Sequence, residues 1–271
     1  MPMRLALVTT VTLGLALAIV APGQGASAQQ AACPQDPVLG RFLLPPEPCF
    51  DIEAWFDGPT THYPHGVLGD DEEFTEIRIK RGRTTLTRKA VSTHVFEDLV
   101  PRLADVDGKP GPEVIVVETF ERGGATLAIY KPDFQEGKRP KFDWIAGTQP
   151  IGERFRWLAP AAIADFDGDG QNDIAYVETP HLDAVLRFVT LRQGRLVELA
   201  AAEGFSNHRS GEAFISGGVR DCGAGPEVIT ANADWTRVMA AKLDGDTVTA
   251  TDLGPFDGAG SFTKALDCAP L

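Results

Sequence analysis

Short apolar runs, separated by turns rich in glycine and aspartate, alternate along the chain after about residue 60. Runs of four to eight residues bounded by such turns are typical of β-strands rather than helices. Outside the repeated segments described next, the pattern predicts strands at 125–130, 141–146, 184–190, 195–200, 236–241 and 247–251. The hydrophobic pattern therefore predicts an all-β protein.

One segment occurs twice in the chain. Residues 103–118 match residues 163–178 position for position, at a spacing of 60. A weaker third copy covers 218–232, and a fourth candidate covers 67–77. Each of the first three copies is followed by two further predicted strands, so a unit of about 50 residues contains four strands. Four strands per unit are typical of a β-propeller blade.

The second copy carries aspartates at alternate positions with glycines between them. Calcium takes 6–8 oxygen ligands, and such a series supplies most of them from one tight turn. An EF-hand would need Glu at the twelfth position, where this chain has Tyr176. An aspartate- and glycine-rich turn without a metal is the alternative interpretation. The residues that we predict to bind Ca²⁺ are Asp165, Asp167, Asp169, Gln171 and Asp173.

The segment from Asp165 to Asp173 resembles the FG-GAP or VCBS repeat of integrin α-subunit-like propellers and their bacterial relatives. In those repeats a DxDxDGxxD loop lies between the first and second strands of a blade. The resemblance covers about residues 60–268 and is strongest over 97–204. It implies a β-propeller fold and bound calcium, and it implies little about activity.

The other copies depart from this motif. The first copy has Lys109 at the third ligand position and Glu113 at the last, and the third copy has Val219 at the first and Gly223 at the third. In the fourth candidate, Glu76 takes the place of the last carboxylate. We therefore expect one calcium site, with the ammonium of Lys109 replacing the ion in the first copy.

The repeat also predicts the number of blades. Residues 60–93, 94–150, 151–206 and 207–256 form four units, and residues 257–271 together with 33–59 form a possible fifth. We favour five four-stranded blades over four. The C-terminal run 261–266 then acts as the first strand of the last blade, so that the N- and C-terminal segments close the ring and remove exposed sheet edges.

The N-terminus predicts export. Arg4, an uncharged apolar stretch to Val20 and the sequence Ala26-Ser27-Ala28 are typical of a cleaved signal peptide over residues 1–28. An uncleaved anchor and a lipoprotein anchor at Cys33 are the alternatives. We expect a secreted or periplasmic protein, monomeric and without a transmembrane segment in the mature chain, in which residues 29–59 precede the propeller at 60–271.

Charge and cysteine content fit this location. Without the signal peptide, 24 Lys and Arg face 38 Asp and Glu, a net charge of −14, because Arg4 is the only charged residue removed from a chain of net charge −13. Such acidity argues against nucleic acid as a partner, because phosphate contacts need clustered cations. Four cysteines in an exported chain predict two disulfides with three possible pairings. We favour Cys33 with Cys49 and Cys222 with Cys268.

In a four-stranded blade, the loop between the second and third strands and the connection to the next blade lie on the face of the disc opposite the calcium loop. A second group of polar residues is expected on that face. Convergent histidines and arginines there suit an anionic ligand. The candidate ligand-binding residues are His65, Arg156, Glu178, His181, His208, Arg209 and Trp235. We expect a binding module for a protein, a glycan or a small anion. The alternative is a hydrolase or lyase that uses Glu178, His181 and His208 as acid and base groups, although the sequence shows no nucleophile with its base.

Overall fold

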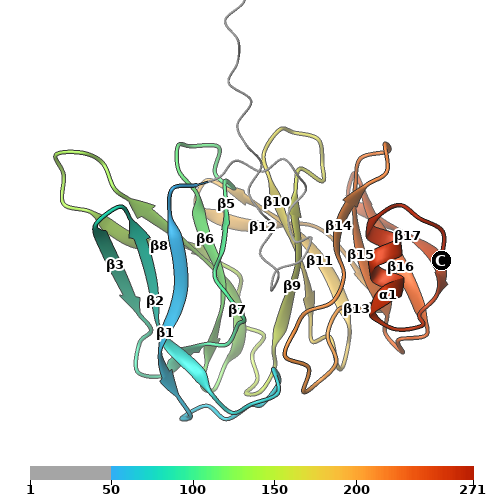
Figure 1. The fold of residues 1–271 in the computed structure, drawn as a ribbon, viewed down its shortest axis with the longest axis horizontal. Helices are drawn as coiled ribbons and strands as arrows, with labels where there is room; N and C mark the ends of the chain where they lie inside the picture. The colour runs from blue at the N-terminus through green and yellow to red at the C-terminus, as the bar shows by residue number, and fades with distance from the viewer. Residues whose placement is uncertain (1–49) are drawn as a thin grey trace, which may run out of the picture. The chain divides into compact units, whose positions relative to one another are not determined.

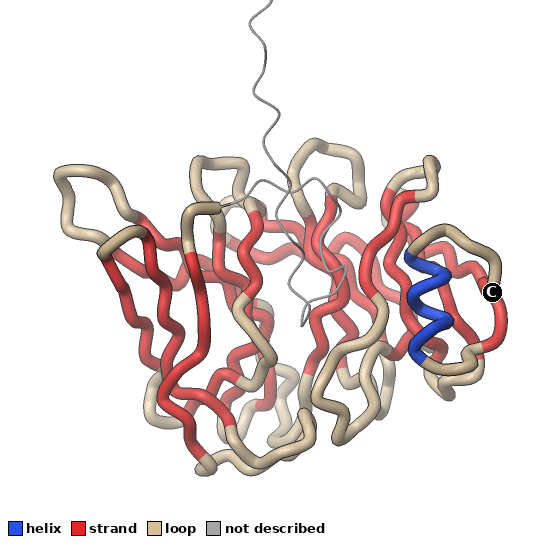
Figure 2. The backbone as a smooth tube through the Cα atoms, in the orientation of Figure 1, coloured by secondary structure: helices blue, strands red, loops and turns tan. Residues whose placement is uncertain are grey.

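We describe a computed structural model of the chain, in which residues 50–271 are placed (Figure 1). The proposed signal peptide and the predicted Cys33–Cys49 disulfide lie outside the described residues. The described part is an all-β structure of antiparallel sheets with one short helix, as Figure 2 shows. Within residues 50–271, no helix has the length and apolar character needed to span a membrane.

The first sheet contains eight strands in the order β1-β2-β4-β6-β7-β8, with β3 paired to β2 and β5 paired to β6. Only one residue pair, Phe74 with Phe96, joins β2 to β4. The strands are β1 (Glu53–Thr60), β2 (Glu73–Arg81), β3 (Thr84–Lys89), β4 (His94–Phe96), β5 (Arg102–Ala104), β6 (Glu113–Phe120), β7 (Gly124–Asp133) and β8 (Lys141–Gly147).

The other two sheets follow in chain order. The second has the order β12-β11-β10-β9, and the third has the order β13-β15-β16-β17 with β14 paired to β15. Their strands are β9 (Leu158–Ala164), β10 (Asp173–Glu178), β11 (Val185–Arg192), β12 (Arg195–Glu203), β13 (Phe205–Ser206), β14 (Gly218–Asp221), β15 (Pro226–Asn232), β16 (Arg237–Asp244) and β17 (Thr247–Pro255). The predicted strands at 125–130, 141–146, 184–190, 195–200, 236–241 and 247–251 overlap β7, β8, β11, β12, β16 and β17 and are confirmed.

Three four-stranded antiparallel units therefore recur: β5 to β8, β9 to β12, and β14 to β17. In each unit the loop of the sequence repeat joins the first strand to the second. Strand β6 also pairs with β4, and β15 also pairs with β13, whereas β9 alone pairs with the full length of β10.

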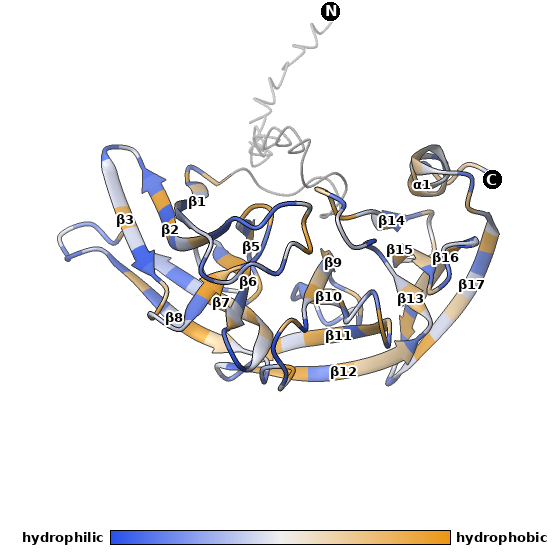
Figure 3. Cartoon of the chain, turned by 90° about the horizontal axis from the view of Figure 1, so that it is seen from below, coloured by the Kyte–Doolittle hydropathy of each residue, from blue (hydrophilic) through white to orange (hydrophobic). Residues whose placement is uncertain are grey.

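The second strand of each unit is buried on both faces. Val114 and Val116 of β6 belong to the core shared with β2, while the alternate residues Ile115 and Val117 belong to the core shared with β9 and β10. Because side chains alternate across a strand, successive residues of β6 contribute to two different cores, one on each face of the sheet. Outer strands β12 and β17 have one exposed face, and hydropathy alternates along them in Figure 3.

The prediction of a C-terminal strand at 261–266 is wrong, because residues Ala259–Leu266 form helix α1. Phe262, Ala265 and Leu266 follow helical spacing, and the first two are buried against the third sheet. The predicted Cys222–Cys268 disulfide is present, with Cα atoms 5.9 Å apart, and it fixes the end of this helix to the loop after β14. The structure thus stabilises the C-terminus by helix packing and a disulfide.

The N-terminal part of the described chain begins with a strand pair. Residues 53–60 form β1, which pairs with β2 along its length. Strand β2 begins at Glu73, so Glu76 lies inside a strand and is bound by Arg78 and Lys89 rather than closing a loop. The fourth candidate copy of the repeat is therefore not a carboxylate loop.

Candidate functional site

The loop of residues 165–172 joins β9 to β10 and is folded around the carboxylate of Asp173. One oxygen of this group, Oδ2, accepts the backbone N–H groups of Phe166 at 3.1 Å and Asp167 at 3.3 Å. Asp165 Oδ2 accepts the N–H of Gly170 at 3.0 Å. The glycine has a φ of 90°, a left-handed conformation that glycine adopts without strain. These bonds hold the carboxylates of the loop together at its centre.

Oxygen atoms of Asp165, Asp167 and Asp173 lie within 4.8 Å of one another. Asp165 Oδ1 and Asp173 Oδ1 are buried and accept no hydrogen bond within the described part of the chain. Thr190 Oγ1 is also buried and has no hydrogen-bond partner of normal geometry there. Its hydroxyl is close enough to Asp173 to act on the pKa of that carboxyl in the lowering direction. Buried polar atoms without partners are rare in proteins. This donor set fits a hard cation.

The electrostatics of the cluster favour a positive charge. Burial raises the pKa of Asp173 to about 6, and the negative charge of Asp167 adds to the rise. A bound cation would remove this repulsion. Of the other predicted ligands, Asp169 lies at the exposed rim and accepts the N–H of Gln171, whose side chain donates to the carbonyl of Leu191.

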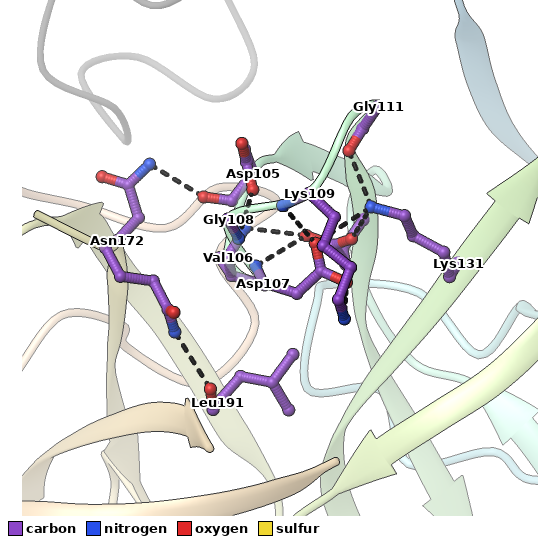
Figure 4. A network of polar contacts seen from close by, with 11 residues as sticks. Asp105, Val106, Asp107, Gly108, Lys109, Gly111, Lys131, Asn172 and Leu191 are labelled. Carbon is purple, nitrogen blue, oxygen red and sulfur yellow. Dashed lines mark hydrogen bonds and ion pairs between the residues drawn. The ribbon is translucent and has the colours of Figure 1, made fainter. Parts of the chain in front are cut away.

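The equivalent loop between β5 and β6 has the same two backbone bonds to its last carboxylate but a different centre. Glu113 Oε2 accepts the N–H groups of Val106 at 2.7 Å and Asp107 at 3.2 Å. The other oxygen of Glu113 is contacted by the ammonium of Lys131, which also lies 3.2 Å from Asp107 Oδ1 and 2.8 Å from the carbonyl of Gly111 (Figure 4). A side chain on β7 therefore supplies a positive charge inside this loop.

The sequence prediction named the wrong lysine for this role. Lys109 does contact Asp107 at 3.0 Å, but its side chain is 74% exposed, against 19% for Lys131. The pKa of Lys131 is raised because Glu113 and Asp107 outweigh the effect of burial. Burial raises the pKa of the Glu113 carboxyl, and Lys131 opposes that rise. Lys131, rather than Lys109, is the internal counter-charge.

The third loop also has a lysine at the equivalent place, but this lysine contacts a backbone carbonyl rather than the last carboxylate. The second and third strands of each unit pair in the same way beside the loop. The equivalent Cα pairs are Val114 with Tyr130, Ile174 with Val189, and Val228 with Ala241. The next residues along, Lys131, Thr190 and Lys242, therefore take equivalent places. Lys242 binds the carbonyl of Ala224 in its loop. Two of the three loops thus have a lysine where the Asp165 loop has a threonine.

The first two loops contact each other and border a large cavity. Asn172 Nδ2 donates to the carbonyl of Asp105 at 3.0 Å (Figure 4). A cavity of about 1280 Å³ lies beside both loops. Its basic side chains are already paired with carboxylates: Arg81 with Asp51, Lys109 and Lys131 with Asp107, and Arg192 with Asp167. The cavity therefore offers no uncompensated positive charge for a ligand.

A cluster of histidines lies beyond the other ends of these strands. His65 Nδ1 donates to Glu97, whose side chain is fully buried and also accepts the hydroxyl of Thr119 at 2.7 Å. Burial raises the pKa of Glu97, and His65 opposes the rise. The indole N–H of Trp157 donates to the carbonyl of Glu97 at 2.8 Å. Glu97 therefore connects His65 to Trp157, and no sequence motif predicts a role for this carboxylate.

His181 and His208, predicted to lie close together, are in direct contact. His208 Nε2 donates to the carbonyl of Glu212 at 2.8 Å, so Nδ1 of the neutral ring is an acceptor. His181 Nε2 donates to it at 2.8 Å, and Trp157 packs against both rings. Although part of His181 is exposed, burial of the rest lowers its pKa to about 4, with His208 and His65 adding to the effect. Burial lowers the pKa of His208 too.

The remaining predicted residues have separate partners. Arg209 binds Glu212 and lies over the ring of Trp235 at 4.8 Å. Arg156 pairs with Glu153 at 3.1 Å. Glu178 pairs with Arg187 at 2.8 Å and forms no hydrogen bond with either histidine, so it does not form the predicted acid and base group with them. The buried carboxylate that contacts a histidine of this cluster is Glu97.

Comparison with known proteins adds no identification. No model of a known protein family matches the chain, and no curated protein matches its sequence. The function therefore has to be argued from the geometry of the sites.

Proposed function

We propose that the protein is a calcium-binding β-propeller whose Asp165 loop holds one structural Ca²⁺. The observation that carries this proposal is the pair of buried, unpartnered carboxylate oxygens of Asp165 and Asp173, beside the equally unpartnered hydroxyl of Thr190. All donors in the cluster are oxygens, which are the ligands of Ca²⁺ rather than of softer metals. The residues that would hold the ion are Asp165, Asp167 and Asp173, with Asp169 and the carbonyl of Gln171 completing the set.

The propeller is supported by the way the sheets repeat. Three four-stranded antiparallel units follow one another, and the second strand of each is buried between two neighbouring cores. The resemblance of the loop to FG-GAP and VCBS repeats supports the same fold. We propose that strands β1 to β3, with β4, form the corresponding first blade.

The histidine cluster is the proposed binding face. Loops on a rigid scaffold are the usual place for binding residues. Four of the six non-glycine residues with left-handed backbone among residues 50–271 flank this end: Phe155, Thr179, Ala184 and Trp235. Such strain concentrates at functional sites. We propose an exported module that binds a protein, a glycan or a small anion through this face, since the Cys222–Cys268 disulfide suits an oxidising compartment.

A second candidate function is catalysis by a hydrolase or lyase at the same face. The observation that favours it is that two histidines are oriented by partners, His65 by Glu97 and His181 by His208. An imidazole fixed through one nitrogen presents the other to a substrate as a base. Cleavage of a polyanionic glycan that is retained in His65→Ala and His181→Ala variants would exclude this candidate.

The calcium proposal is tested by thermal unfolding in EDTA and in excess Ca²⁺. Binding to the folded state alone adds about 2.7 kcal/mol at a hundredfold excess over Kd. The wild-type protein should melt higher in Ca²⁺, and Asp167→Asn should remove the difference. Asp107→Asn, the same change in the neighbouring loop, is the matched control and should keep it. Equal melting of the wild-type protein in both solutions would reject the proposal.

A further inference from the structure

A smaller cavity, of about 230 Å³, lies between strands β3 and β8 of the first sheet. Strands β1 to β4 meet the unit of β5 to β8 there. It is separate from the carboxylate loops and from the histidine cluster. Its size is below the range of drug-sized ligand pockets and suits one small ring. The lining includes a buried carboxylate, an arginine and an exposed indole, which are Glu118, Arg88 and Trp144.

The floor of this cavity is a hydrogen-bonded triad centred on Glu118, which is 7% exposed. Tyr130 donates its hydroxyl to Oε2 at 2.6 Å, and His94 Nδ1 donates to Oε1 at 2.8 Å. Burial and the charge of Glu118 raise the pKa of Tyr130, so the hydroxyl remains a donor. With Nδ1 engaged and the ring packed on Phe120, His94 keeps Nε2 for another partner. The triad therefore fixes His94 as a hydrogen-bonding group beside the cavity.

Arg88 supplies the positive charge. Its guanidinium lies over the ring of Tyr130 at 5.5 Å, and it forms no ion pair with a carboxylate among residues 50–271. Other strand arginines do form such pairs, including Arg78 with Asp57 and Arg237 with Asp252. A guanidinium without a carboxylate partner binds a ligand carboxylate through two parallel hydrogen bonds. Arg88 therefore gives the cavity a cation that can take an anionic group of a ligand.

Trp144 and two threonines indicate which other groups a ligand of this cavity would carry. The indole of Trp144 lines the cavity and is 52% exposed, so it is accessible to a ligand there. Its flat face suits the C–H surface of a ring. Thr126 and Thr148, which bond to each other at 3.1 Å, add hydroxyl groups. Hydroxyls on the ligand ring would pair with these groups and with His94.

We propose that this cavity binds a single uronic acid ring, with its carboxylate on Arg88 and its ring on Trp144. The site combines the three elements that such a ligand presents: one negative charge, one apolar ring face and several hydroxyls. The proposal does not depend on calcium or on the histidine cluster. It identifies one class of anionic glycan unit that the protein would recognise.

Isothermal titration with galacturonate and glucuronate tests the proposal. At least one of them should bind saturably, and galactose and galacturonate methyl ester should bind at least tenfold more weakly, because they lack the charge. Arg88→Gln and Trp144→Ala should each weaken binding at least tenfold. Arg78→Gln is the matched control, since this arginine lies outside the cavity on the adjacent strand, and it should leave the affinity unchanged.

Three results would overturn the inference. The first is no saturable binding of either uronate at tens of millimolar. The second is equal affinity for galacturonate and galactose, a comparison that needs no variant. The third is unchanged affinity in Arg88→Gln when its thermal unfolding matches that of the wild-type protein.

Discussion

The Asp105 and Asp165 loops are copies of one sequence repeat and share two backbone bonds to their last carboxylate, but their centres carry different charges. In both, the last carboxylate accepts two N–H groups at the start of the loop. In the first, the remaining oxygen of that carboxylate is bound by the ammonium of Lys131. In the second, the equivalent neighbour is Thr190, and one oxygen of each carboxylate, Asp165 Oδ1 and Asp173 Oδ1, has no hydrogen-bond partner in the described structure.

In these two loops, the residue at the equivalent place on the third strand distinguishes how the carboxylates are neutralised. A lysine there supplies a permanent internal cation, whereas a threonine leaves room for an exchangeable ion and adds one oxygen. The third loop has Lys242 at this place, but Glu227 is already paired with Arg220 at 2.8 Å. The loop that lacks the lysine is also the loop with the complete aspartate series, so two independent features support this loop as the proposed calcium site.

Removal of the internal cation should have the largest effect. Lys131→Met leaves Glu113, with a fully buried side chain, without its counter-charge, and breaking a buried pair costs about 3–5 kcal/mol. Urea unfolding in EDTA measures the loss. Lys109→Met is the control, because this exposed lysine forms a surface pair that should be worth about 0–1 kcal/mol. Equal losses in the two variants would show that Lys131 is not the counter-charge.

Transfer of the lysine to the Asp165 loop should change the free energy of unfolding by a smaller amount, and the direction of the change should differ between Ca²⁺ and EDTA. Thr190→Lys places an ammonium beside Asp173, so the calcium-dependent stabilisation of about 2.7 kcal/mol at a hundredfold excess should fall to near zero. Stability in EDTA should rise. Thr190→Ser keeps the hydroxyl and should keep the calcium response. If Thr190→Lys folds normally and responds to Ca²⁺ as the wild-type protein does, the two loops are not neutralised in equivalent ways.

The sequence predicts the strands and the carboxylate loop because both depend on local patterns. Alternation of apolar residues predicts β-strands, and the spacing from Asp165 to Asp173 predicts the cluster. Lys131 is different, because its place beside Glu113 depends on the register between β6 and β7. The intervals from Glu113 to Lys131, from Asp173 to Thr190 and from Glu227 to Lys242 differ with the length of the intervening turn.

Other parts of the sites depend on contacts between distant segments. Glu97 approaches His65 from 32 residues away, and neither residue has a neighbour in sequence that indicates the contact. The C-terminal run around Phe262 was predicted as a strand from its apolar content alone, whereas its apolar residues fit a helix that packs on the third sheet. Tertiary packing decides such short segments.

The most direct test of the calcium account is to count the ions that bind. Isothermal titration of Ca²⁺ into EDTA-stripped and dialysed wild-type protein should give one site per chain, because the Asp165 loop has unpartnered oxygens and Lys131 already neutralises the Asp105 loop. No binding would contradict the assignment of the Asp165 loop as a metal site. Two sites of similar affinity would contradict the role given to Lys131.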